Sequence, residues 1–187
     1  MSRYRAAWVL PIAQRPIRRG WVSTANGRIT GLGDGPAEAG EIDLGDVAVL
    51  PGLVNAHTHL ELSYLHGQVP AAGEFVDWIR GVVSLRRTQP DPRSAAITDA
   101  LAQSIADAVK AGTVLVGDIS NTLVPVAALG QSALGGVVFH ELIRFNAPQP
   151  QAFVDEAWRA IESCGANGDV RVGLAAHAPY SVAPSVF

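Results

Sequence analysis

Cysteine, lysine and charge are all scarce in this sequence. Among its 187 residues there is one cysteine, Cys164, one lysine, Lys110, and a charged fraction of only 17%. A single cysteine excludes an internal disulfide, so we expect a reducing compartment. The apolar stretch Ala6 to Leu10 is broken by Pro11, and no run approaches the length of a membrane span or a signal-peptide core. We therefore expect a cytoplasmic protein with no membrane partner.

The charge pattern argues against a nucleic-acid partner. The net charge is -3, and the fourteen basic residues are scattered apart from a small cluster at Arg15, Arg18 and Arg19. Hydrophobic residues make up 48% of the chain, which is typical of a globular protein with a real core. We expect a small-molecule substrate, and a homo-oligomer is left open.

The first fifty residues predict a small β domain. Apolar strands are expected over 6–12 and 41–50, and Asn26-Gly27 between two short apolar segments is a strong hairpin signal. We place a small β domain at residues 1–50 and a second domain at 51–187.

In the second domain, apolar strands alternate with helices. Helices are predicted over 73–88, 94–111, 123–131 and 152–163. Strands are predicted over 51–59, 113–118, 134–139 and 170–176. Apolar strands separated by helices are typical of a parallel sheet, either in a doubly wound open sheet or in a (β/α) barrel.

Polar residues stand where these strands end. His57 and His59 end the first strand, Asp118 closes the second, His140 follows the third and His177 follows the fourth. Active sites of (β/α) barrels gather at the C-terminal ends of the strands. The pattern therefore favours the barrel, although it also fits the rim of an open sheet.

The pair His57 and His59 predicts half of a metal site. Alternation along a strand puts both imidazoles on one side and Thr58 on the other. Such a pair suits a first-row metal that lowers the pKa of a bound water. Taken alone, a His-x-His is as often coincidence, and its position at the end of an apolar strand favours the metal site.

Four segments together resemble the amidohydrolase superfamily of metal-dependent hydrolases, and within it the deaminase branch that acts on aminodeoxyfutalosine, S-adenosylhomocysteine or methylthioadenosine. The segments are 51–63, 75–79, 112–121 and 177–181. The resemblance implies the N-terminal half of a (β/α)8 barrel, about four β/α units at residues 51–187, after a small, incomplete β-sandwich-like domain at residues 1–50.

The resemblance also implies roles for individual residues. His57 and His59 would be ligands of one divalent metal ion, with zinc expected first and iron, manganese or nickel as alternatives. His177 would bind substrate, and Glu141 and Glu61 are weaker substrate-binding candidates.

The position of the only lysine argues for one metal ion. Members of the superfamily with two metals usually carry a carboxylated lysine on the fourth strand, whereas Lys110 precedes the second strand. Asp118 is predicted to be structural, because Ser120 and Asn121 beside it suit a helix cap.

The implied activity is hydrolysis of a carbon–nitrogen bond other than a peptide bond, as deamination of an aminopurine nucleoside or a similar aromatic amine. The catalytic residues and the remaining metal ligands are expected beyond Phe187, so the chain is predicted to be an inactive fragment of the enzyme. Two alternatives stay open. One is an amidase or chlorohydrolase of the same superfamily. The other is a catalytically inactive binding or assembly module, against which the matched pair His57 and His59 argues.

Overall fold

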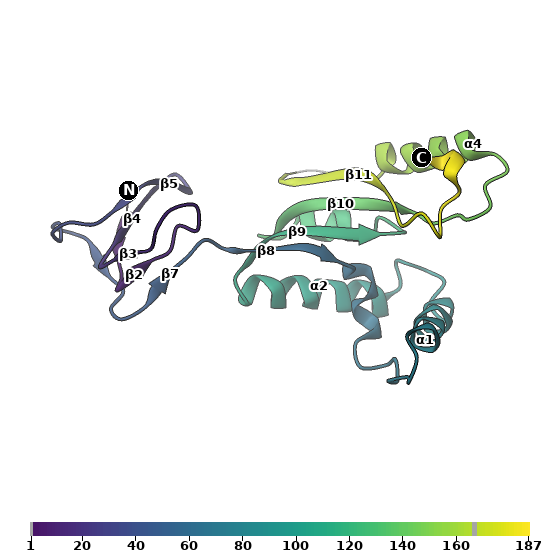
Figure 1. Cartoon of the computed structure of the whole chain (residues 1–187), viewed down its shortest axis with the longest axis horizontal. Coiled ribbons are helices and arrows are strands. Elements are labelled where there is room, and N and C mark those ends of the chain that lie inside the picture. The colour runs from purple at the N-terminus through teal and green to yellow at the C-terminus, as the bar shows by residue number, and fades with distance from the viewer. Residues whose placement is uncertain (1, 166–167) are drawn as a thin grey trace. The chain divides into compact units, whose positions relative to one another are not determined.

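The computed structural model describes residues 2–165 and 168–187 (Figure 1). The chain forms two compact units, Met1–Gly52 and Leu53–Phe187. Within the described residues, no helix combines the length and the apolar character that a membrane crossing needs.

The N-terminal unit consists of two small sheets. One has the strand order β5-β4-β1-β6 and the other β3-β2-β7. The strands are β1 (Ser2–Arg5), β2 (Trp8–Val9), β3 (Ile17–Arg18), β4 (Trp21–Ala25), β5 (Arg28–Gly33), β6 (Ile42–Asp43) and β7 (Ala48–Val49).

Turns decide where these short strands end. Asn26 and Gly27 have φ angles of 51° and 72°, as the predicted hairpin requires, and they join the antiparallel pair β4 and β5. The continuous strands predicted over 6–12 and 41–50 are wrong. Positive φ angles at Ile12 (64°) and Gly45 (76°) turn the backbone, so only two-residue strands form on either side.

The second unit is a four-stranded parallel sheet with helical connections, which confirms the predicted α/β arrangement. Its strand order is β11-β10-β9-β8. The strands are β8 (Leu53–Thr58), β9 (Thr113–Ser120), β10 (Gly135–Leu142) and β11 (Val170–Ala176). The helices are α1 (Phe75–Arg87), α2 (Ala95–Lys110), α3 (Pro125–Gly130) and α4 (Pro150–Ser163), with 3-10 turns η1 (Leu60–Leu65) and η2 (Pro184–Val186).

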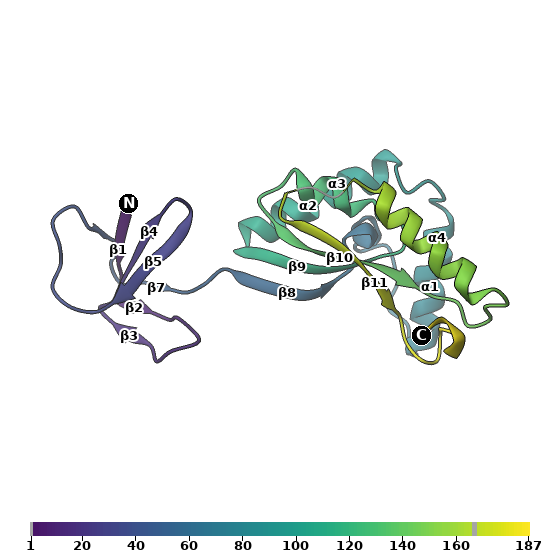
Figure 2. The ribbon, with the colours of Figure 1, turned by 90° about the horizontal axis from the view of Figure 1, so that it is seen from above.

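The core of this unit lies between the sheet and its helices. Figure 2 shows α2, α3 and α4 along one face of the sheet. Val116, Val138 and Val170 on that face are buried. They pack in one cluster with Leu101 and Ile105 of α2 and Val126 and Leu129 of α3. Burial of these large apolar side chains supplies most of the driving force for folding.

An irregularity between β8 and β9 positions the two histidines. The pairing register shifts between Asn55 and Thr58, and Thr58 then pairs with Asp118. At Gly117 a Cβ atom would lie 2.5 Å from the carbonyl oxygen of Ala56, so only glycine fits beside this bend.

Candidate functional site

His57 and His59 lie at the C-terminal end of β8. His57 is within the strand and exposed, and His59 is the half-buried residue before η1. Their ring centroids are 5.2 Å apart with planes at 78°. The backbone N–H of His57 donates to Oδ1 of Asn55 at 3.2 Å, which supports the bend before it. The pair is close enough to serve one ion, and its role as a metal ligand stays a prediction.

The donor set fits part of a metal site. Neutral imidazoles are common zinc ligands, and two of them fill two of the four positions of a tetrahedral site. Across residues 2–165 and 168–187, no group of three or more His, Cys, Asp or Glu side chains gathers where it could hold an ion. Among the described residues, this part of the sheet thus brings together two candidate ligands and no third.

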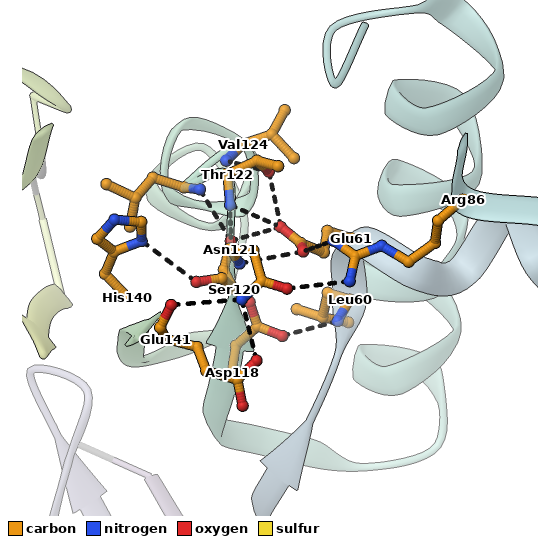
Figure 3. Close-up of polar contacts among 11 residues, drawn as sticks. Leu60, Glu61, Arg86, Asp118, Ser120, Asn121, Thr122, Val124, His140 and Glu141 are labelled. Carbon is orange, nitrogen blue, oxygen red and sulfur yellow. Dashed lines mark hydrogen bonds and ion pairs between the residues drawn. The ribbon is translucent and has the colours of Figure 1, made fainter. Parts of the chain in front are cut away.

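Glu61 lies two residues after His59 and is the most heavily hydrogen-bonded side chain near the pair. It is only 4% exposed. Its Oε2 accepts from Ser120 Oγ (2.6 Å) and from Thr122 N (3.1 Å) and Oγ1 (2.6 Å). Its Oε1 accepts from Asn121 N (3.0 Å) and Arg86 Nη2 (3.2 Å) (Figure 3). Five donors use the lone pairs of one carboxylate, so these contacts lend no support to substrate binding by Glu61, which stays a prediction.

A continuous polar chain leads from Glu61 to Glu141. Arg86, in the last turn of α1, also donates from Nη1 to Asn121 Oδ1 at 3.0 Å. Asn121 Nδ2 in turn donates to Glu141 Oε2 at 3.0 Å. The chain joins η1, α1 and the loop after β9 to β10 (Figure 3). It thereby holds the carboxylate of Glu141 by one oxygen, and within residues 2–165 and 168–187 the other oxygen accepts no hydrogen bond.

His140 and Glu141 lie inside a strand and not after it as predicted. β10 continues to Leu142 because its polar end still pairs with β11, with Glu141 opposite Ala175. His140 Nδ1 lies 3.4 Å from the carbonyl oxygen of Ser120. Both residues line a cavity of about 480 Å³ that also includes Arg86 and Phe153.

The carboxylate of Asp118 binds the backbone of the segment that follows the two histidines. It is fully buried, and its Oδ1 accepts from the backbone N–H of Leu60 at 2.7 Å. Its Oδ2 has no hydrogen-bond partner among the described residues. Burial raises the pKa of Asp118 to about 7, with the Leu60 N–H acting against it and the Glu61 charge adding to it. These contacts agree with a structural role for Asp118.

The raised pKa of Asp118 predicts a pH-dependent stability. Between about pH 4 and 7 the folded state holds the proton more tightly than the unfolded chain, so the free energy of unfolding falls as pH rises and stays lower above pH 7. Asp118→Asn removes this dependence. The free energy of unfolding of the variant minus that of wild type should therefore rise by up to about 4 kcal/mol from pH 4 to pH 8. Urea unfolding of both proteins across this range measures the gain. Parallel stability curves would contradict the prediction.

His177 stands directly after β11 and is exposed. Its backbone N–H donates to the carbonyl oxygen of Leu142 at 3.1 Å, which places it beside the end of β10. Its Nδ1 lies 2.6 Å from Ser181 Oγ, and the ring of Tyr180 meets it edge-on with centroids 5.9 Å apart. The substrate-binding role of His177 stays a prediction.

Comparison with known proteins relates the chain to one family. The model of the amidohydrolase family matches residues 48–187. An adenosine deaminase of Helicobacter pylori is 31% identical over 72% of this chain and 32% of its own length. An aminodeoxyfutalosine deaminase of Nitratiruptor sp. is 29% identical over 72% of the chain and 33% of its length. The chain thus spans about a third of the length of these curated relatives.

Solved structures show the same fold. The H. pylori aminofutalosine deaminase in complex with methylthio-coformycin superposes with a TM-score of 0.78 at 25% identity, over 97% of this chain and 45% of that one. A zinc-bound adenosine deaminase from Xanthomonas campestris gives 0.74 at 22% identity, over 96% and 43%. The zinc complex of the atrazine chlorohydrolase TrzN from Arthrobacter aurescens gives 0.78 at 16% identity, over 100% and 49%, and its likeness concerns the fold alone.

Proposed function

The chain belongs to the amidohydrolase family, and from this premise we propose that the whole protein is a metal-dependent deaminase that hydrolyses the amino group from an aminopurine nucleoside. One observation carries the proposal. The pair His57 and His59 ends the first strand of the parallel sheet in a chain whose similar curated relatives are named as deaminases of adenosine-type compounds.

In this proposal the residues of the chain hold and orient the reactants. His57 and His59 hold one divalent ion, which we propose is zinc, with iron, manganese and nickel as alternatives. The ion, when bound, supplies an activated water. Asp118 holds the backbone N–H of Leu60 and Ser120 holds the carboxylate of Glu61, so hydrogen bonds fix both residues that follow His59. His177 binds the substrate from the end of β11, and the strand Val170–Ala176 offers no lysine for a second metal.

The rival chemistry within the family is amide hydrolysis or dechlorination. The chlorohydrolase likeness rests on 16% identity, whereas relatives that are 27–31% identical are named as deaminases. This difference favours a nucleoside substrate. We propose a cytoplasmic enzyme that acts on a small molecule.

The proposal is tested by measuring ammonia released by the zinc-loaded whole protein. The panel is adenosine, 5'-deoxyadenosine, methylthioadenosine, S-adenosylhomocysteine and aminodeoxyfutalosine. Ring opening of hydantoin and release of chloride from atrazine are followed separately as the rival reactions, because neither reaction gives ammonia. We expect turnover of at least one nucleoside, and a fall of about 100-fold in His177→Ala with metal content unchanged. His66→Ala, in an exposed loop, is the control. Turnover of only a rival substrate, or loss of metal in His177→Ala, would contradict the assignment.

A further inference from the structure

The segment after His177 is a tightly held turn. The backbone N–H of Ser181 donates to the carbonyl oxygen of Ala178 at 3.0 Å, with Pro179 at the second position of the turn, where its fixed φ is favoured. The next residue, Val182, is fully buried and bridges to Arg144 as an isolated β pair. The hydroxyl of Ser181 is therefore presented to His177 from a fixed backbone.

That hydroxyl has one proton and two acceptors within reach. Ser181 Oγ lies 2.6 Å from His177 Nδ1 and 3.1 Å from the carbonyl oxygen of Ala178. The Ala178 oxygen already accepts the backbone N–H groups of Ser181 (3.0 Å) and Val182 (3.1 Å), which use its two lone pairs. A separation of 2.6 Å is also typical of a hydroxyl donor and shorter than most N–H donors give. The hydroxyl of Ser181 therefore donates its proton to Nδ1 of His177.

We propose that Ser181 is a positioning residue that holds neutral His177 in the tautomer with its proton on Nε2. An imidazole that accepts at Nδ1 carries its only N–H at Nε2. The edge-on ring of Tyr180, with planes at 87°, packs beside the imidazole in this orientation. His177 then offers the substrate a hydrogen-bond donor, which selects an acceptor such as a purine ring nitrogen. The identity of the substrate rests on the proposed function, and the tautomer does not.

The tautomer is measured directly by nitrogen NMR. In the whole protein labelled with ¹⁵N-histidine at pH 8, without substrate, the His177 signals should show a bare Nδ1 and a protonated Nε2, with His177→Gln identifying them. Ser181→Thr keeps a hydroxyl donor and should leave the pattern unchanged. Ser181→Asp offers only acceptors and should move the proton to Nδ1. A protonated Nδ1 in the wild-type protein would overturn the proposal.

The second readout is turnover of the nucleoside that the substrate panel identifies. We expect kcat/KM within about threefold of wild type for Ser181→Thr, about tenfold lower for Ser181→Ala, and lower still for Ser181→Asp, although aspartate keeps a bond to the ring. Ser163→Ala is the matched control, because Ser163 Oγ, like Ser181 Oγ, lies close to the carbonyl oxygen three residues back, at 2.9 Å, but faces no histidine. Wild-type turnover in Ser181→Asp would refute the donor role. A protein that turns over no nucleoside but shows the expected tautomers would refute the proposed function and leave the assignment of Ser181 standing.

Discussion

His57→Ala should release the proposed metal ion from the whole protein and reduce the proposed deaminase activity at least about 1000-fold. With one of the two imidazoles gone, the ion loses a ligand that no neighbouring His, Cys, Asp or Glu among the described residues replaces. Because the side chain is exposed and outside the apolar cluster, the fold should survive the change. Metal analysis after dialysis should give about one ion per chain in wild type and less than about 0.1 in the variant.

His66→Ala is the matched control for this experiment. His66 is also an exposed histidine of the same segment, but it follows η1. It should keep both metal and turnover. Full metal content in His57→Ala would show that the ligand assignment is wrong, and equal loss of metal in both variants would point to a general effect on the loop.

Helices and parallel strands could be predicted because their apolar periodicity is local. The prediction of a helix over 73–88 matches α1 (Phe75–Arg87) within two residues, since its pattern continues over several turns. The N-terminal strands were less predictable. Ile12 has a positive φ in a turn that the hydrogen bond from the Ala13 N–H to the Pro11 carbonyl oxygen closes at 2.8 Å, and a β-branched residue does not predict such a φ.

The candidate site, like the fold, could be predicted from the sequence only in part. The closely spaced pair His57 and His59 could be recognised in the sequence. The hydrogen-bonded link from Arg86 through Asn121 to Glu141 could not be predicted from it. Arg86 precedes Asn121 by 35 residues, and an arginine in the last turn of an amphipathic helix is typical of a solvated face. The one available signal was Glu61, an acidic residue between apolar Leu60 and Leu62, which a buried partner would explain.

Glu61→Ala should be among the most destabilising single changes in this chain. It removes the acceptor of five hydrogen bonds and leaves Ser120 Oγ, Thr122 Oγ1 and the Arg86 guanidinium without it. A buried donor left without an acceptor costs about 1–3 kcal/mol, and several donors lose theirs here, so the total should be about 3–5 kcal/mol. We expect a loss of this size in the free energy of unfolding, measured by urea denaturation of the whole protein. Glu162→Ala, an exposed glutamate of α4, should change it by less than about 0.5 kcal/mol.

Two further variants separate the charge of Glu61 from its hydrogen bonds. Glu61→Gln keeps the volume but turns an amide N–H₂ toward other donors, so its loss should lie below that of Glu61→Ala and above that of Arg86→Met. Arg86→Met removes one donor of five, and the guanidinium it replaces is one-third exposed, so its cost should be about 1 kcal/mol. The order Ala, Gln, Met identifies Glu61 as the centre of the network, since Asn121 N, Thr122 N and Thr122 Oγ1 of the loop after β9 all donate to its carboxylate. If Arg86→Met proved as costly as Glu61→Ala, the guanidinium and its second bond to Asn121 would be the centre instead.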